Sequence, residues 1–288
     1  MLRKSVRLMA SVGLAALFSL AAPSPALAQE YLGSNLRPFA VLAGSAVTCT
    51  GASTVTGDMG IDPNNASSIT GFPDPCTVTG TTHAADATSL AAQGDLTTAF
   101  TTLGTLPCGL DLTGTNLGGL TLTPGVYCFS TSAQLTGLLT LNALGDPNAV
   151  WVFQIGSTLT TASGSSVVFS GGIGNACGVE WRVGSSATLG TTTSFAGNIL
   201  AQASITLNTG ANLAGRALAR TGAVTLDGNN VATFTACGAG GGAGGPPTPF
   251  PPPGVPTLPE IGGWVLLVVL LGGGIYLVSR RTWATSGH

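Results

Sequence analysis

Six Thr-Leu pairs recur at nearly constant intervals, apart from one longer gap, over residues 121–226. The pairs begin at Thr121, Thr140, Thr158, Thr188, Thr206 and Thr225, so the gaps are 19, 18, 30, 18 and 19 residues. A repeat of about 18 residues, rich in Thr, Ser, Val, Leu and Gly, is typical of a β-solenoid, whose stacked coils share one core. Because neighbouring strand residues face opposite sides, we expect each Leu to point inward and each Thr outward, in one ladder.

The segments around this repeat predict further elements. Short Thr/Val runs ended by Gly or Pro predict strands over residues 31–80, and strands resume from about 110 to about 234. The 30-residue gap indicates an insertion at residues 171–175. An Ala-rich stretch predicts one helix over about residues 82–103, capped by Thr82 and ended by Gly104. Its apolar positions have helical spacing: Ala85, Ala92, Leu96, Phe100 and Leu103.

The amino-terminal segment has the pattern of a secretory signal. Arg3, Lys4 and Arg7 precede a mostly apolar run over residues 12–20, and a small-x-small site ends at Ala28. We therefore expect residues 1–28 to be a signal peptide for the Sec pathway. The solenoid domain would then occupy residues 29–237 of an exported protein.

The carboxy-terminal segment predicts an anchor. Residues 238–254 are rich in Gly and Pro, as in a linker, and residues 261–278 form an uncharged run long enough for a transmembrane helix. Together with Arg280 and Arg281, residues 255–281 resemble the tripartite IPTL-type sorting signal of Gram-negative bacteria. The resemblance implies an exosortase-like sorting enzyme as a partner and a location at the cell envelope or outside the cell. The alternative is that the helix stays in the membrane.

All six cysteines lie in the part predicted to be exported. An even number of cysteines in an oxidising compartment favours disulfides, although sequence alone does not choose the pairing. We expect pairs that join segments lying close together along the coil. These pairs are Cys108 with Cys128, Cys49 with Cys76, and Cys177 with Cys237.

Charge is sparse throughout the chain. The formal net charge is −2, only 7% of residues are charged, and no lysine occurs between residues 31 and 237. A nucleic-acid partner is therefore excluded, because phosphate neutralisation needs clustered Lys and Arg. We expect the four arginines of this region to serve the fold, as partners of Asp or Glu: Arg37, Arg182, Arg216 and Arg220.

The groups that enzymes use for chemistry are few and scattered. His83 is the only histidine of residues 29–237, and no second catalytic group is recognisable beside it, so we expect a packing or hydrogen-bonding role at the helix start. The carboxylates are not paired, the cysteines lack zinc spacing, and no glycine-rich phosphate loop occurs. We expect no enzymatic activity, no cofactor and no metal.

The outward threonines themselves are the remaining candidates for function. Stacked strands are about 4.7–4.9 Å apart, so each ladder would present hydroxyls and methyls at an interval close to the repeat of the ice lattice. A flat, weakly charged array of this kind could hold ice-like water. The alternative is that the threonines serve β propensity and solubility alone.

Six separated motifs resemble the widespread microbial ice-binding protein family. They occupy residues 39–45, 56–61, 83–87, 119–127, 145–156 and 215–219, and the resemblance runs from about Tyr31 to Phe234. It implies a mainly β fold: an irregular, discontinuous β-solenoid of roughly triangular section with one long α-helix packed alongside. It also implies a protein that binds ice crystals.

The resemblance also implies which residues would meet ice. That family often carries Thr, then Ala or Gly, then any residue, then Thr or Asn on its ice-binding face, and residues 209–212 match this pattern. We expect the ice-binding set to lie round a corner from the Thr-Leu ladder: Thr161, Thr191, Thr193, Thr209, Ala211 and Asn212. The second choice is the ladder itself: Thr158, Thr188, Thr206 and Thr225.

Two functions of different classes follow. The first is a monomeric, exported, surface-attached antifreeze protein that adsorbs to ice through a flat solenoid face and inhibits its growth or recrystallisation. The second is a surface adhesin or structural solenoid that binds polysaccharide or cells, for which Trp151 and Trp181 would have to be exposed for sugar stacking; a core position suits them better. A polysaccharide-degrading β-helix enzyme ranks lowest, because no catalytic constellation is present.

Overall fold

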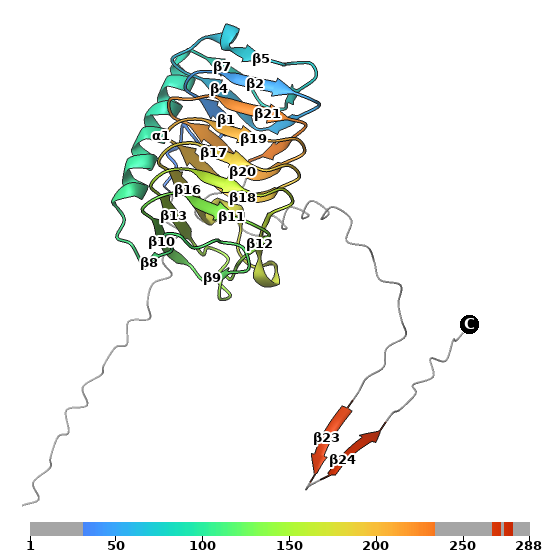
Figure 1. Cartoon of the computed structure of the whole chain (residues 1–288). Coiled ribbons are helices and arrows are strands. Elements are labelled where there is room, and N and C mark those ends of the chain that lie inside the picture. Colours follow the sequence, from blue (N-terminus) through green and yellow to red (C-terminus); the bar gives the residue numbers. More distant parts are fainter. Residues whose placement is uncertain (1–30, 234–266, 272–273, 279–288) are drawn as a thin grey trace, which may run out of the picture. The chain divides into compact units, whose positions relative to one another are not determined.

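The computed structural model describes residues 31–233, 267–271 and 274–278. Residues 31–233 wind into stacked coils whose parallel strands form three faces, with one long helix along one side (Figure 1). A mainly β solenoid with a single α-helix in this region is therefore confirmed.

The helix face is the one covered by helix α1. From the bottom of the stack in Figure 1 to the top, its strands lie in a continuous parallel series. They are β8 (Leu110–Asp111), β10 (Gly125–Phe129), β13 (Trp151–Ile155), β16 (Val179–Val183), the second halves of β18 (Ser194–Ala201) and β20 (Asn212–Ala219), β1 (Phe39–Ala43), β4 (Asp58–Ile61) and β7 (Thr82–Ala84).

The second face continues from the helix face round a corner. Strands β18 and β20 span both faces, and they bend at Gly197 and Gly215, whose φ angles are 115° and 148°. A Cβ atom on Gly215 would lie 2.0 Å from the carbonyl oxygen of Gly197, so only glycine allows the two bends to stack. The strands of this face are β9 (Thr121–Leu122), β12 (Leu138–Leu141), β15 (Ser166–Phe169), the first halves of β18 and β20, β22 (Asn230–Ala232), β3 (Thr54–Thr56) and β6 (Thr77–Val78).

The third face is a separate seven-stranded parallel sheet, which we call the threonine face. Its strands are short, and each alternates an inward apolar residue with an outward polar one. In spatial order they are β11 (Ala133–Leu135), β14 (Leu159–Thr161), β17 (Ala187–Leu189), β19 (Ile205–Leu207), β21 (Val224–Asp227), β2 (Val47–Thr50) and β5 (Ile69–Thr70).

The coils do not stack in chain order. The amino-terminal strands lie directly on the last coil, so that β1 pairs with β20, β2 with β21 and β3 with β22. Val41, for example, is opposite Ala217. The solenoid is therefore discontinuous, as expected, and its upper coils depend on contacts between distant parts of the sequence.

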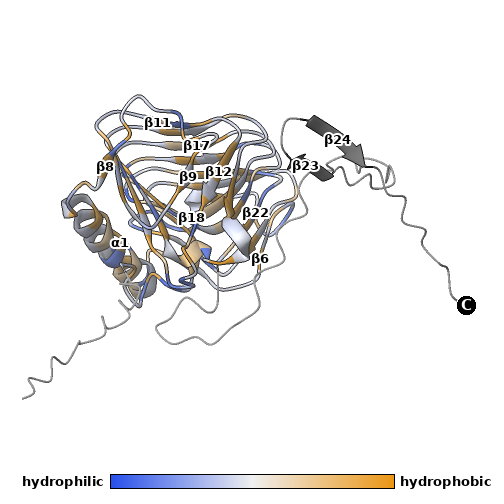
Figure 2. Cartoon of the chain, turned by 90° about the horizontal axis from the view of Figure 1, so that it is seen from below, coloured by the Kyte–Doolittle hydropathy of each residue, from blue (hydrophilic) through white to orange (hydrophobic). Residues whose placement is uncertain are grey.

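The interior of the coils is filled by apolar side chains. The strands around it carry many hydrophobic residues, coloured orange in Figure 2. Aromatic rings stack from coil to coil: the ring centroids of Phe153 and Trp181 are 3.8 Å apart, and those of Tyr127 and Phe153 are 5.4 Å apart. Trp151 and Trp181 are fully buried, and their indole N–H groups donate to the carbonyls of Leu122 and Ala196. The core position expected for both tryptophans is confirmed, so neither can stack on a sugar.

Helix α1 spans Ala87–Thr105, which corrects both predicted ends. Residues 82–84 pair with β4 instead, and Asp86 caps the helix: its side chain accepts from the Ser89 N–H while the Ser89 side chain accepts from the Asp86 N–H. This capping box satisfies the N–H groups of both Asp86 and Ser89, whereas a cap at Thr82 would satisfy neither. Gly104 lies inside the last turn. The helix packs its apolar side on Leu42, Val152, Leu200 and Leu218 of the helix face.

His83 has a structural environment. Its Nδ1 lies 2.8 Å from Oδ2 of Asp86, and its ring packs 5.5 Å from that of Phe39. The histidine thus supports the helix cap, in agreement with the role expected for it.

The insertion and two of the three disulfides lie where the sequence places them. Between β15 and β16 the chain forms two short 3-10 turns, Ser170–Gly172 and Ala176–Gly178, and a third, Ala66–Ser68, precedes β5.

Cys49 is bonded to Cys76 and Cys108 to Cys128, with Cα atoms 6.3 and 5.8 Å apart. The pairing of Cys177 with Cys237 stays a prediction, because Cys237 lies outside the described residues.

The carboxy-terminal unit differs from the expected transmembrane helix. Leu267–Leu271 (β23) pairs antiparallel with Gly274–Val278 (β24). Three consecutive glycines at residues 272–274 disfavour a helix at about 1 kcal/mol each, and the Val/Leu/Ile-rich runs beside them suit paired strands. In the part of the chain that the structure describes, no helix is both long and apolar enough to cross a membrane. Residues 1–28, the linker over 238–254 and the motif at 255–260 lie outside the described residues.

Candidate functional site

A row of outward side chains runs across all seven strands of the threonine face. Each member is directly opposite the next in the strand register, so the row is continuous. We call it the central row: Gln134, Thr160, Thr188, Thr206, Thr225, Thr48 and Thr70.

A second outward row lies two residues before the central row, just ahead of six of the seven strands. Backbone hydrogen bonds one residue before the strands keep the same register: the N–H of Ala187 donates to the carbonyl of Ser204, and that of Ile205 to the carbonyl of Ala223. We call it the flanking row: Ser132, Thr158, Ser186, Ser204, Ala223 and Ala46.

The two rows form a regular and uncharged array. Neighbouring strands are about 4.7–4.9 Å apart, and the two rows are about 6.4–6.8 Å apart along the strand. The rows hold only Thr, Ser, Ala and Gln side chains. Helix α1 packs on a different face and leaves this one uncovered. The array can offer hydroxyls and methyls to a periodic surface, but it has no group that could transfer a proton.

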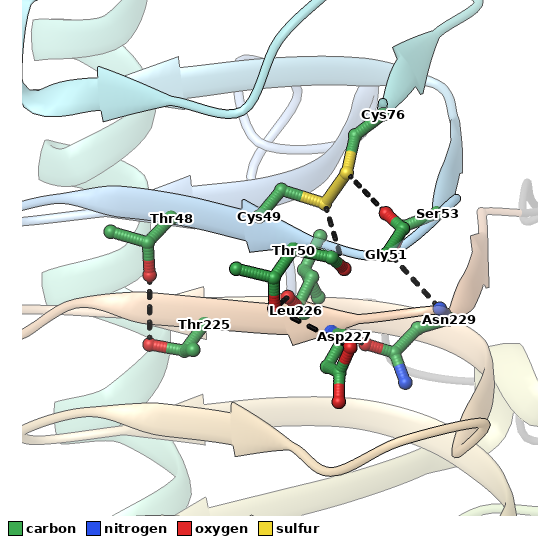
Figure 3. Close-up of a disulfide and its surroundings, with 10 residues drawn as sticks. All are labelled: Thr48, Cys49, Thr50, Gly51, Ser53, Cys76, Thr225, Leu226, Asp227 and Asn229. Atoms are coloured by element: carbon green, nitrogen blue, oxygen red, sulfur yellow. Dashed lines mark hydrogen bonds between the residues drawn. A yellow bond between two sulfur atoms is a disulfide. The ribbon is translucent and has the colours of Figure 1, made fainter. Parts of the chain in front are cut away.

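Contacts between neighbours restrict the side chains of the array. The hydroxyl of Thr48 donates to that of Thr225 at 3.1 Å (Figure 3), and the hydroxyl of Thr158 donates to that of Ser132 at 2.8 Å. Threonine is also stiff at χ1 because it is branched at Cβ. The hydroxyls of these four residues are therefore held by a neighbour before any ligand arrives. The disulfide between Cys49 and Cys76 lies just behind this part of the face.

One charged side chain, Asp227, stands at the edge of the face. Asp227 follows Leu226 in β21, and its carboxylate accepts hydrogen bonds from the hydroxyls of Thr209 and Thr50. The carboxylate thus has hydroxyl donors of its own and stands outside both rows.

Half of the preferred ice-binding set is buried, which corrects that prediction. Thr161, Thr193 and Ala211 are at most 3% exposed, and the hydroxyls of Thr161 and Thr193 are 2.9 Å apart inside the corner. The physical reason is register: Thr161 lies opposite Leu135, so it occupies an inward position. These three residues turn the chain from the threonine face to the second face and cannot touch a ligand.

The other three residues of that set do not share one surface. Thr191 and Thr209 are exposed in the corner loops, where Thr191 donates to Ser163 at 2.7 Å. Asn212 lies on the second face, opposite Ser194 and Asn230. The expected ladder over residues 161–212 is therefore absent from the described coils.

The second-choice set lies on the threonine face. Thr188, Thr206 and Thr225 are consecutive in the central row, and Thr158 is in the flanking row. The leucine of each of the six Thr-Leu pairs is buried, as predicted. The prediction that all six threonines form a single ladder is wrong, however, because Thr121 and Thr140 pair with each other on the second face.

Sequence reasoning missed four members of the central row. Thr160, Thr48 and Thr70 are followed by Thr161, Cys49 and Gly71 in place of Leu, and Gln134 breaks the Thr pattern. A signal was nevertheless present, since each of the four follows an apolar residue, as the other central-row residues do.

The buried corner hydroxyls give a stability prediction. We expect Thr193→Val to lower the free energy of unfolding by about 1–3 kcal/mol, because it removes one of the two partners of the buried Thr161 hydroxyl and a donor to the Ala162 carbonyl. Urea denaturation measures this, and Thr191→Val in the exposed part of the same loop is the matched control. Equal stability of the two variants would contradict a structural role for Thr193.

The molecule is a parallel solenoid with one long helix and an uncharged face of threonines in register. The ice-binding-like family model matches residues 41–232, and the chain belongs to this family. The chain is 53% identical over 195 residues to an ice-binding protein of Nostoc sp. (strain HG1), covering 67% of this chain and 71% of that protein. It is 34% identical over 206 residues to an ice-binding protein of Flavobacterium frigoris (strain PS1), covering 67% and 72%.

Solved structures agree with this membership. The fold is similar to that of an ice-binding protein from an Antarctic biological consortium, with a TM-score of 0.67, 43% sequence identity, and 80% of this chain and 96% of that chain covered. It is also similar to a glycosylated ice-binding protein from an Arctic yeast, with a TM-score of 0.67, 30% identity, and 72% and 95% covered. The mainly β solenoid with one helix is thus shared with ice-binding proteins.

Proposed function

We propose that this protein binds ice through the threonine face. The observation that carries the proposal is the central row, in which seven strands present six threonines and one glutamine in unbroken register. Ice-binding activity named for its relatives supports it.

The face suits adsorption to a crystal better than recognition of a small molecule. Its hydroxyls can anchor surface water while the threonine methyls stand at the same regular interval, so many weak contacts add up over a flat area. Adsorbed molecules would pin the growing ice front, and ice that bulges between them has a lowered local freezing point. No cofactor takes part in this mechanism.

We also propose that the protein is exported and attached to the cell surface as a monomer. The pattern of residues 1–28 supports export, and the resemblance of residues 255–281 to a sorting signal of Gram-negative bacteria supports attachment by an exosortase-like enzyme. A surface protein of this kind would place the threonine face in contact with extracellular ice.

Growth of a single ice crystal in the purified protein tests the proposed function. We expect the crystal to become faceted and to show a gap between its melting and freezing temperatures in a nanolitre osmometer. The control is the same protein after denaturation. A round, unmodified crystal at high protein concentration would overturn the proposal.

A further inference from the structure

Two arginines of neighbouring coils contact one aromatic ring of helix α1. The guanidinium carbon of Arg182 lies 4.3 Å from the centre of the Phe100 ring, and that of Arg220 lies 4.7 Å from it. Arg182 points outward from β16, and Arg220 follows β20 directly. Two positive charges therefore meet beside helix α1, at the ring of Phe100.

Neither arginine has the carboxylate partner that the sequence led us to expect. Within residues 31–233, Arg220 donates to the side chains of Gln202 and Thr97, and Arg182 donates no hydrogen bond. The Nε atoms of both are buried without an acceptor. The pairing with Asp or Glu predicted for Arg182 and Arg220 is therefore wrong, because no carboxylate of the described coils reaches them.

The helix makes room for the Arg182 guanidinium. A Cβ atom on Gly104 would lie 3.1 Å from Nε of Arg182 and 3.2 Å from its Cζ and Nη2, which is closer than most such contacts. Glycine inside a helix costs about 1 kcal/mol relative to alanine. Glycine at position 104 therefore lets the Arg182 guanidinium approach the helix closely, at a cost in helix stability.

The unpaired charges are unfavourable as they stand. Burial lowers the pKa of Arg182, and the positive charge of Arg220 lowers it further. A partly buried charge without a counter-charge loses hydration, and the contacts of the two guanidinium groups with the Phe100 ring offset only part of that loss. An oxyanion would relieve both effects, because guanidinium groups bind carboxylate, sulfate and phosphate through parallel hydrogen bonds.

We propose that Arg182 and Arg220 form a binding site for an oxyanion, namely a phosphate, sulfate or carboxylate group. Arg182 supplies the free donors, and Arg220, which Gln202 and Thr97 hold in place, supplies the second charge. The site lies on the side of the coils that α1 covers, away from the threonine face. It would let the protein hold an anionic group while the threonine face stays free.

Titration of the full chain with inorganic phosphate tests the site. At constant ionic strength, we expect phosphate and sulfate to raise the melting temperature above its value in chloride, with binding measured by calorimetry. Arg182→Gln should weaken phosphate binding about tenfold or more, because it removes the free donors. Arg182→Lys should weaken it less, because the charge remains but the parallel donors are lost.

Thr102→Ala, on the exposed side of the same helix, is the control and should bind phosphate like the original protein. Phosphate that acts no differently from chloride would overturn the proposal and leave the arginines as a clamp between helix and coils. Unchanged binding by folded Arg182→Gln or Arg182→Lys protein would overturn it as well. Ice shaping is measured separately, so failure of one proposal leaves the other distinguishable.

Discussion

Replacing Thr206 with tyrosine is expected to remove most of the thermal hysteresis, which is the difference between the melting and freezing temperatures of ice in a solution of the protein. Thr206 lies on β19, the middle strand of the seven, so it occupies the centre of the central row. A tyrosine ring would stand above the methyls and hydroxyls of Thr188 and Thr225 on either side and keep them from the ice. We expect a loss of about tenfold in hysteresis, since the weak contacts of both neighbours are lost together.

Matched tyrosine substitutions show whether the effect belongs to the threonine face. Thr56→Tyr places the same ring on an outward threonine of the second face, and Thr209→Tyr places it in the corner loop. We expect both variants to keep most of the activity and all three to keep the circular dichroism of the original protein. Full activity of Thr206→Tyr, or equal loss at Thr56, would remove the threonine face from consideration.

The stability of the protein is expected to fall as the pH rises from about 5 to 9, and Glu180→Gln is expected to remove most of this dependence. Glu180, Asn198 and Arg216 lie in register on the helix face, and each is at most 3% exposed. Asn198 donates to Glu180 and accepts from Arg216, both at 3.0 Å. Arg216 also donates to the carbonyl of Arg37 at 2.8 Å, which ties the amino-terminal segment to the last coils.

Stability falls with rising pH because the carboxyl group of Glu180 is buried. Burial raises the pKa of Glu180 to about 8, against smaller lowering effects of the Asn198 hydrogen bond and the Arg216 charge. Its folded-state pKa is then above the unfolded value of 4.5, so its contribution to stability is complete below pH 4.5 and is lost as pH rises through 8. Each pH unit in this window costs at most about 1.4 kcal/mol.

Melting temperatures at pH 5 and pH 9 measure this dependence. The original protein and Glu180→Gln should have similar values at pH 5, and the variant should be the more stable at pH 9. Tyr31 does not interfere, because burial and the charge of Glu180 raise its pKa above the usual 10. Parallel pH curves for the two proteins would contradict a buried, proton-binding Glu180.

Much of the fold could be predicted because strand alternation is a local property. Leu189, Leu207 and Leu226 are buried as their spacing indicates, and the predicted disulfides of Cys49 and Cys108 join segments close along the coil. The helix start was misplaced, since the mutual hydrogen bonds of Asp86 and Ser89 outweigh the cap expected from Thr82.

The candidate site was harder to predict because it depends on register. Thr161 has the same local sequence character as Thr160, yet one faces the core and the other the solvent. A shift of one residue moves a side chain to the opposite face of a strand. The motif at residues 209–212 matches the pattern of the family, but its first three residues lie in a corner loop, where Ala211 is buried, and Asn212 begins β20 on the second face.

The coil repeat and the inward leucines can be read from the chain alone, because they depend on residues a few positions apart, and the scarcity of charge is a matter of composition. Which threonines share a face depends on how the coils stack. Thr48 stands beside Thr225 because the amino-terminal coil pairs with the last one across 177 residues of sequence, and Thr121 and Thr140 leave the row because their strands fall on another side of the coil. Corner lengths and long-range strand pairing set these positions, and neither is a local property of the chain.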